Sequence, residues 1–143
     1  IQNRKASYDY EFLEKFEAGL ALLGTEVKSV QEGQMDIAGA VVKVLNGVPY
    51  LLGASIPAYQ PANTPPDYDP GRSRALLLHA HEIKKLIENT KEKGLTIVPI
   101  SVYNKGPLIK LELAIARKKK KSDKREAIKQ REVKREIKRK LSR

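Results

Sequence analysis

His79 and His81 are the only histidines of the chain, and their type and spacing could serve metal binding. In a strand both imidazoles would lie on one face and could supply two of the ligands that a zinc site needs. No third ligand is spaced to complete such a site, and the absence of cysteine excludes thiolate ligands and disulfides. We therefore expect no metal and no cofactor, and a structural or RNA-facing role for the histidine pair.

Catalytic patterns are absent from the sequence. It contains no phosphate-binding loop, no zinc-protease motif and no nucleophile elbow, and no pair among its 17 carboxylates stands out. Tyr and Phe together number eight, and we expect most of them to pack in a core while some could stack on bases. These observations predict a binding protein and not an enzyme.

Positive charge is concentrated at residues 117–143, which hold 15 Lys/Arg and four Asp/Glu and so carry the whole net charge of +11. Residues 1–116 hold 13 basic and 13 acidic residues and are neutral. Such asymmetry points to nucleic acid or to an anionic membrane, with a solubilising tail as the alternative. We expect a neutral body over 1–116 and a basic tail over 117–143.

Membrane-spanning and export signals are not visible. No apolar run approaches the ~20 residues that cross a bilayer, and no signal peptide is seen, although Ile1 is not a start methionine. The lack of cysteine permits a reducing compartment. We expect a cytoplasmic protein without a membrane attachment.

Short strands dominate the body. Over residues 8–22 the even positions are apolar except Glu14, and four odd positions, Asp9, Glu11, Lys15 and Glu17, are charged. This pattern favours a strand, although a helical stripe also fits. Asn46-Gly47 separates two aliphatic runs and predicts a hairpin with a type I′ turn. Two further strands flank residues 104–107. In the second of them the apolar set faces the core and the other set mostly solvent; the apolar set is Ile109, Leu111, Leu113 and Ile115, and the other is Lys110, Glu112 and Ala114.

Two short helices complete the inventory. One follows Thr25, a possible N-cap, and stops at Gly33. The other begins near His81 after a short apolar strand, faces the core with Ile83, Leu86 and Ile87, and ends at Gly94. Residues 60–74 contain four prolines and predict a loop. Five to six short strands with two helices predict a mainly β fold, a small closed or partly closed β-barrel.

Five stretches follow one another across nearly the whole chain: NRKA at 3–6, FEAGLALLGTEVKS at 16–29, DPGRSRALLLH at 69–79, KEKGLTIVP at 91–99 and DKREAIKQRE at 123–132. In this order and spacing the chain resembles the family of SsrA-binding proteins. The resemblance implies an oligonucleotide-binding-like barrel with flanking helices that binds the transfer-RNA-like domain of transfer-messenger RNA (SsrA). It also implies delivery of that RNA to stalled ribosomes, where the tail probes the empty mRNA channel.

The resemblance assigns RNA contacts to six residues of the body: Asn3, Arg4, Lys5, Glu17, Lys28 and Leu77. A carboxylate such as Glu17 can accept hydrogen bonds from base amino groups or a 2′-hydroxyl, or hold a nearby arginine. Without the resemblance, residues 3–5 would be a frayed terminus, Glu17 an outward-facing strand carboxylate, Lys28 a solvated lysine and Leu77 a core leucine.

In the tail, the resemblance implies contacts with small-subunit rRNA at the decoding centre and mRNA channel. The residues concerned are Lys118, Lys119, Asp123, Lys124, Arg125, Lys129, Arg131 and Lys134. Asp123, Lys124 and Arg125 match a motif needed for tagging rather than for RNA binding. Val133, Ile137 and Leu141 form a stripe too narrow to stabilise an isolated basic helix. We therefore expect the tail to be disordered when free and helical on the ribosome.

Two competing functions fit parts of the same pattern. A general ribosomal or translation-factor module would also combine a neutral barrel with a basic arm. A membrane-surface protein could use the tail as an anchor, but the apolar stripe of the tail has no aromatic residue for interfacial burial. We expect one monomer per transfer-messenger RNA, the stalled ribosome as second partner, and no membrane.

Overall fold

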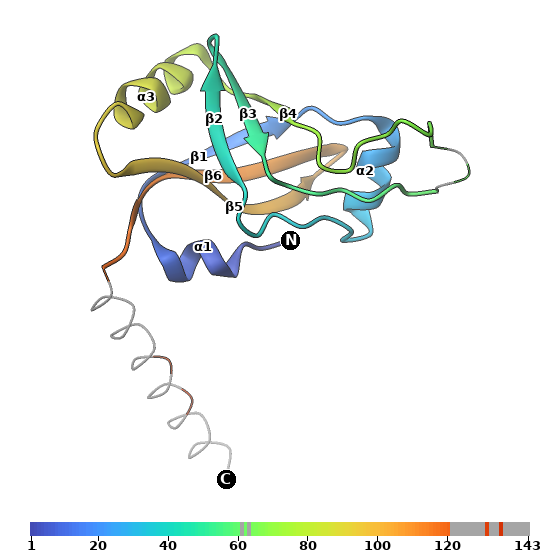
Figure 1. The fold of residues 1–143 in the computed structure, drawn as a ribbon, viewed down its shortest axis with the longest axis horizontal. Helices are drawn as coiled ribbons and strands as arrows, with labels where there is room; N and C mark the ends of the chain where they lie inside the picture. Colours follow the sequence, from blue (N-terminus) through green and yellow to red (C-terminus); the bar gives the residue numbers. More distant parts are fainter. Residues whose placement is uncertain (61, 63, 121–130, 132–134, 136–143) are drawn as a thin grey trace.

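Six antiparallel strands close into a barrel within residues 1–60, 62, 64–120, 131 and 135, which the computed structural model describes (Figure 1). Around the barrel they follow the order β1-β4-β3-β2-β5-β6. The strands are β1 (Tyr10–Leu20), β2 (Val41–Leu45), β3 (Val48–Leu52), β4 (Arg74–Leu77), β5 (Leu95–Lys105) and β6 (Leu108–Lys118). The predicted mainly β barrel is confirmed.

The β2–β3 hairpin turns at Asn46-Gly47, as the sequence predicts. Both residues have positive φ, 51° and 78°, which is the backbone that a type I′ turn requires. Its tip projects beyond the barrel in Figure 1. The β5–β6 hairpin turns at Gly106 and Pro107, so the two long strands of the sheet pair over most of their length.

A bulge at Leu13 divides β1 into two parts that face opposite sides of the sheet. Phe12 pairs with Ala116, whereas Glu14 pairs with Ile115, so one residue of β1 is inserted without a partner. Tyr10 and Phe12 therefore pack on the outer face, while the even positions from Phe16 onward face the core. The strand predicted here from the sequence is confirmed. The prediction that all even positions form one apolar face is wrong.

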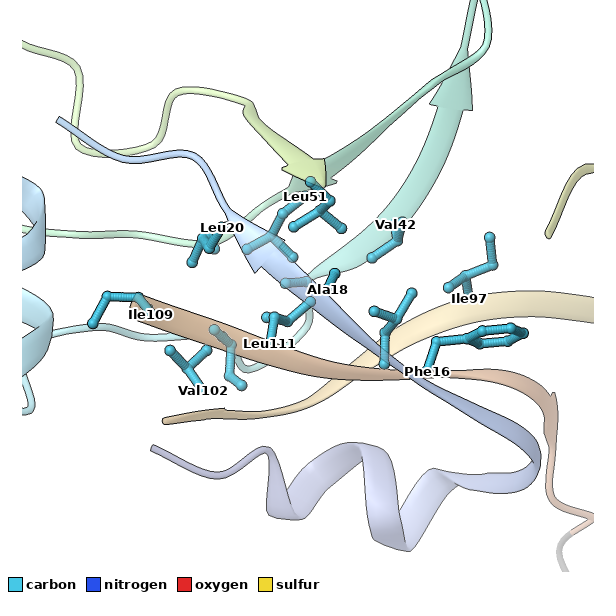
Figure 2. Packing of buried hydrophobic residues seen from close by; sticks show 14 of the residues in the cluster. Phe16, Ala18, Leu20, Val42, Leu51, Ile97, Val102, Ile109 and Leu111 are labelled. Carbon is cyan, nitrogen blue, oxygen red and sulfur yellow. The ribbon is translucent and has the colours of Figure 1, made fainter. Parts of the chain in front are cut away.

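The core fills the barrel (Figure 2). Its buried members come from every strand and from the helical residues Val30 and Leu86, because the inward set of each strand is mostly aliphatic. The predicted inward set of β6 is confirmed, since Ile109, Leu111, Leu113 and Ile115 are all buried. Figure 2 shows Ile109 and Leu111 of β6 among labelled side chains from β1, β2, β3 and β5.

In the described part of the chain, three helices lie against the barrel: α1 (Arg4–Asp9), α2 (Gly24–Gln31) and α3 (Ala80–Thr90). Helix α2 begins one residue before Thr25, and its first turn is closed by Glu26, whose Oε1 accepts the Leu23 N–H at 2.9 Å. The N-cap role predicted for Thr25 is therefore wrong. Helix α3 buries Leu86 completely and ends at Thr90, before Gly94.

Helix α1 was not predicted from the sequence, and it covers part of the outer face of the sheet. Ala6 packs with Val98 of β5 and Ala116 of β6, and Ala114 is also fully buried. The expectation that Ala114 faces solvent is wrong, because α1 lies across this end of β5 and β6. Small alanine side chains let the helix approach the sheet closely.

The last strand runs past the predicted boundary between body and tail at 116/117. Strand β6 continues to Lys118, and the Lys119 N–H donates to the Asp9 carbonyl at 2.8 Å. The predictions for Asp123, Lys124, Arg125, Lys129, Val133 and Lys134 lie outside the described residues, and so does most of the predicted disorder-to-helix behaviour of the tail.

Candidate functional site

One row of residues crosses the outer face of four strands and organises the site. Tyr103 pairs with Lys110, Lys110 with Gly19, and Gly19 with Leu77, so β5, β6, β1 and β4 each contribute one position. Side chains at paired positions lie on the same face of a sheet. The row therefore places an aromatic, a cation, a glycine and a leucine side by side.

A groove of about 630 Å³ is lined by three members of this row, Lys110, Gly19 and Leu77. Its walls come from the first residues of β3 and β6, the last residues of β1 and β4, and the start of α3. Three of its apolar side chains are unusually exposed, with relative accessibilities of 66% for Leu77, 56% for Leu108 and 39% for Val48. Such apolar exposure in a hollow is typical of a binding surface.

Glu17 and Leu77, two of the residues predicted to contact RNA, line the same groove. They come from β1 and β4, which are 60 residues apart in the sequence and adjacent in the barrel. Leu77 is not a core residue, because its side chain is 66% exposed. The structure therefore joins a carboxylate and a free aliphatic surface in one place.

Gly19 forms the floor between them. A Cβ at this position would lie 3.3 Å from the Leu77 Cβ, which is tighter than normal packing allows without a shift. Its backbone is ordinary extended strand, so the glycine is not required by a turn. The missing side chain keeps the groove open beside Leu77.

The Glu17 carboxylate is held by two side chains of β5, the strand on the far side of β6 from β1. Its Oε2 accepts a hydrogen bond from the Tyr103 hydroxyl, and its Oε1 accepts one from Lys105 Nζ at 3.1 Å. The Tyr103 hydrogen bond and then the Lys105 ammonium lower the pKa of Glu17, while the same hydrogen bond raises the pKa of Tyr103 to about 12. At neutral pH Glu17 is an oriented anion that accepts hydrogen bonds.

A buried ion network lies behind β4 and was missed by the sequence reasoning. Glu26 of α2 is 1% exposed and bonds Arg72 and Arg74, of which Arg74 is fully buried. Arg74 Nη2 lies 2.7 Å from Glu26 Oε2 and also donates to the Pro70 carbonyl at 2.8 Å. Since Arg74 is the first residue of β4, the network fixes the strand that carries Leu77.

The network also holds the proline-rich segment against α2. The Tyr68 hydroxyl oxygen lies 3.0 Å from Glu26 Oε2 and 2.8 Å from the Ile56 carbonyl oxygen, and its one hydrogen can be donated to either. Burial alone would raise the pKa of Glu26, but the hydrogen bonds from Arg72, the Leu23 N–H and Arg74 outweigh it and lower that pKa to about 2. The carboxylate is therefore ionised throughout the physiological range.

His79 and His81 do not share a strand face, contrary to one expectation. His79 immediately precedes α3 and His81 lies in its first turn, and their rings stack with centroids 5.6 Å apart and planes 7° apart. His79 lines the groove. Within the described part of the chain no group of three His, Asp or Glu side chains is arranged to hold a metal ion.

Asn3 starts α1 and is 4% exposed. Its Nδ2 donates to the carbonyls of Pro99 at 2.9 Å and Ile37 at 3.3 Å, and its Oδ1 accepts the Ala6 N–H at 3.1 Å. The whole amide is engaged within the protein. Asn3 is thus a cap that ties the first helix to the barrel, and it presents no free group on the surface.

The exposed residues Arg4 and Lys5 lie on this helix, near the root of the tail. Lys5 and Lys118 line one small hollow of about 210 Å³ between α1 and the start of β2. Lys119 Nζ donates to the Ser7 carbonyl at 3.2 Å. The N-terminal basic motif and the first basic residues after the body therefore meet in one corner, apart from the groove.

The other predicted contacts are dispersed. Lys28 is exposed on α2 with its Nζ 5.8 Å from the centroid of the Tyr59 ring, and it does not line the groove. Arg131 is exposed, and its guanidinium carbon lies 5.7 Å from the centroid of the Tyr8 ring. Guanidinium and ammonium groups at such distances gain modest cation–π attraction.

Comparison with known proteins identifies relatives over the whole chain. The family model described as "SmpB protein" matches residues 1–143. The SsrA-binding protein of Syntrophobacter fumaroxidans is 48% identical over 136 residues, which cover 95% of this chain and 84% of the relative. That of Thermosynechococcus vestitus is 44% identical over 138 residues, which cover 96% of this chain and 91% of the relative.

A solved structure supports the same assignment of the fold. The chain aligns with "tmRNA-SmpB: a journey to the center of the bacterial ribosome" with a TM-score of 0.69 and 41% identity, covering 90% of this chain and 93% of the other. Among the described residues no helix has the length and apolar character needed to cross a membrane.

Proposed function

The chain belongs to the SmpB family of SsrA-binding proteins, and from this premise we propose that it binds transfer-messenger RNA and acts with it in trans-translation on stalled ribosomes. It is a binding protein and not an enzyme. The barrel recognises the transfer-RNA-like domain as one monomer per RNA, in the cytoplasm, and the basic tail contacts small-subunit rRNA in the empty mRNA channel.

The meeting of Glu17 and Leu77 in one groove is the observation that carries this proposal. RNA recognition outside duplexes uses unstacked bases that pack on side chains and hydrogen-bond along their edges. An exposed leucine beside an open glycine floor offers a packing surface, and the oriented carboxylate accepts donors from a base or a 2′-hydroxyl.

Electrostatic attraction for the RNA phosphates comes from basic residues outside the groove. Arg4, Lys5 and Lys118 form a basic corner at α1, and Lys28 lies on α2, so cations flank a body whose first 116 residues are neutral. Phosphate contacts position an RNA while the groove discriminates among RNAs. The tail carries the strongest charge, and there the ribosome offers a dense array of phosphates.

Truncation after Lys120 tests this division directly. The truncated chain retains all six strands and the residues of the core, so we expect it to fold. It should still bind transfer-messenger RNA more than tenfold tighter than an unrelated structured RNA, a difference of about 1.4 kcal/mol. Fluorescence anisotropy at matched salt measures both affinities. Equal affinity for the two RNAs would reject recognition by the barrel and favour a general rRNA-binding module.

Leu77→Ala should weaken RNA binding without weakening the fold. The side chain is 66% exposed, so its loss should change the free energy of unfolding by no more than about 0.5 kcal/mol. If RNA buries it, affinity for transfer-messenger RNA should fall about tenfold. Leu23→Ala is the matched control, because Leu23 is 51% exposed but lies outside the groove. Equal losses of affinity in both variants would refute a contact at Leu77.

A further inference from the structure

We propose that Tyr103 is a positioning residue for RNA recognition. It acts through Glu17, whose carboxylate it holds at the edge of the groove together with Lys105. The inference rests on the RNA-binding function proposed above and adds two residues of β5 to the site. It also states what the groove selects, namely hydrogen-bond donors and not phosphate.

The position of Glu17 is unfavourable without such support. On the outer face it lies directly opposite Glu112 of β6, and like charges at opposed positions of a sheet repel each other. Glu112 in turn pairs with Ser101 of β5. The row that contains Glu17 therefore offers it no positively charged side chain on β6 or β5. Left alone, the carboxylate would turn away from Glu112 and sample several rotamers.

Tyr103 and Lys105 of β5 reach across β6 and restrict the rotamers of Glu17. Each side chain donates to a different oxygen of the carboxylate. The tyrosine hydroxyl donates to Oε2, and the lysine ammonium donates to Oε1. Two bonds to two oxygens fix the plane of the carboxylate as well as its position. A group that is ordered before binding avoids the entropy cost of ordering on binding, and this raises affinity without a new contact.

The same bonds leave acceptor capacity for a ligand. Each carboxylate oxygen has two lone-pair directions, and one bond on each oxygen leaves one direction free. A base edge with amino or imino hydrogens, or a 2′-hydroxyl, can fill these directions, whereas a phosphate oxygen has no hydrogen to offer. The hydroxyl hydrogen of Tyr103 is already donated to Glu17, so the role of Tyr103 is to orient the carboxylate.

Other charged and titratable groups surround Glu17 on every neighbouring element. They are Lys110 and Glu112 on β6, Lys15 on β1, Lys105 and Tyr103 on β5, and His79 and Glu82 at the start of α3. Of these, Tyr103 is the largest cause that lowers the pKa of Glu17, ahead of Lys105. Loss of the hydroxyl should therefore raise that pKa towards its ordinary value of 4.5.

A double-mutant cycle with Tyr103→Phe and Glu17→Gln tests the proposal. The affinity of the full chain for transfer-messenger RNA should fall about three- to tenfold in Tyr103→Phe, the loss expected for one charge-assisted hydrogen bond. In the Glu17→Gln background the same tyrosine change should alter affinity by less than about twofold, because the carboxylate that Tyr103 orients is gone. A carboxyl NMR titration of free Tyr103→Phe should show the raised pKa of Glu17.

Tyr50→Phe is the matched control, since Tyr50 of β3 lines neither the groove nor the hollow beside Lys5 and Lys118, and loss of its hydroxyl should leave RNA affinity unchanged. An equal loss from Tyr103→Phe in both backgrounds would mean that Tyr103 contacts RNA itself, and no loss in either would mean that orientation is irrelevant; both results overturn the proposal. Lys105→Gln in the same cycle gives a second reading if Tyr103→Phe folds poorly, with the same two results overturning it.

Discussion

Glu26→Gln should destabilise the fold by about 3–5 kcal/mol at pH 7, a large part of the total stability of a domain of this size. The change removes the charge that Arg72 and Arg74 share, and Arg74 is fully buried with no solvent to replace the carboxylate. An unpaired buried guanidinium is the physical reason for the size of the loss. Urea unfolding followed by circular dichroism measures it.

The loss should also depend on pH with a definite sign. The pKa of Glu26 is about 2 in the folded state against an ordinary value of 4.5, so the unfolded state binds more protons between these values. The resulting stabilisation, about 3 kcal/mol, is complete above pH 4.5 and disappears as pH falls towards 2. The difference in free energy of unfolding between the wild-type chain and Glu26→Gln should decrease as the pH falls from 4.5 to 2.

Glu88→Gln is a suitable control for this series. Glu88 is exposed on α3, and the same charge is removed at a surface position. Its stability should stay within about 0.5 kcal/mol of the wild-type value. A Glu26→Gln variant as stable as Glu88→Gln, or a gap that does not change between pH 4.5 and 2, would show that the buried network does not secure β4.

The strands could be predicted from the sequence, but their faces could not be predicted in full. Period-two alternation identified β1 and β6, and Asn46-Gly47 identified the hairpin between β2 and β3. The bulge at Leu13 becomes visible only when β1 is paired with β6, because an inserted residue is defined by its missing partner. The register of that pair is set by residues about one hundred positions apart.

The site was predictable in part for the same reason. Family motifs identified Glu17 and Leu77, but no local pattern connects Glu17 with Tyr103, which lies 86 residues later and meets it across β6. The buried role of Glu26 had no local signal, because its partners Arg72 and Arg74 follow 46 and 48 residues later. Helix α1 has six residues, too few to show a helical period.

Replacing Asp123, Lys124 and Arg125 with alanine should reduce peptide tagging on stalled ribosomes at least tenfold. The two cations can contact rRNA phosphates, and arginine does so with a two-pronged fork. Asp123 cannot favour a phosphate, and we expect it to cap a helix that forms on the ribosome, worth about 1 kcal/mol. The three positions lie outside the described residues, so the prediction rests on charge and on the family motif.

Recognition of the RNA should survive that replacement. The groove with Glu17 and Leu77, and the basic corner with Lys5 and Lys118, all lie within the barrel and its first helix. We expect the affinity for transfer-messenger RNA to change by less than about threefold, in line with the loss of a few screened surface charges. A variant that replaces Lys138, Arg139 and Lys140 controls for the loss of basic charge in the tail.

The most direct measurement of the division between barrel and tail determines RNA affinity and tagging yield on the same Asp123, Lys124 and Arg125 triple variant. If the barrel holds the RNA and the tail acts on the ribosome, affinity stays near the wild-type value while tagging falls at least tenfold at saturating RNA. If instead affinity collapses and the remaining tagging merely follows the amount of RNA bound, the tail is an RNA anchor and the division is contradicted.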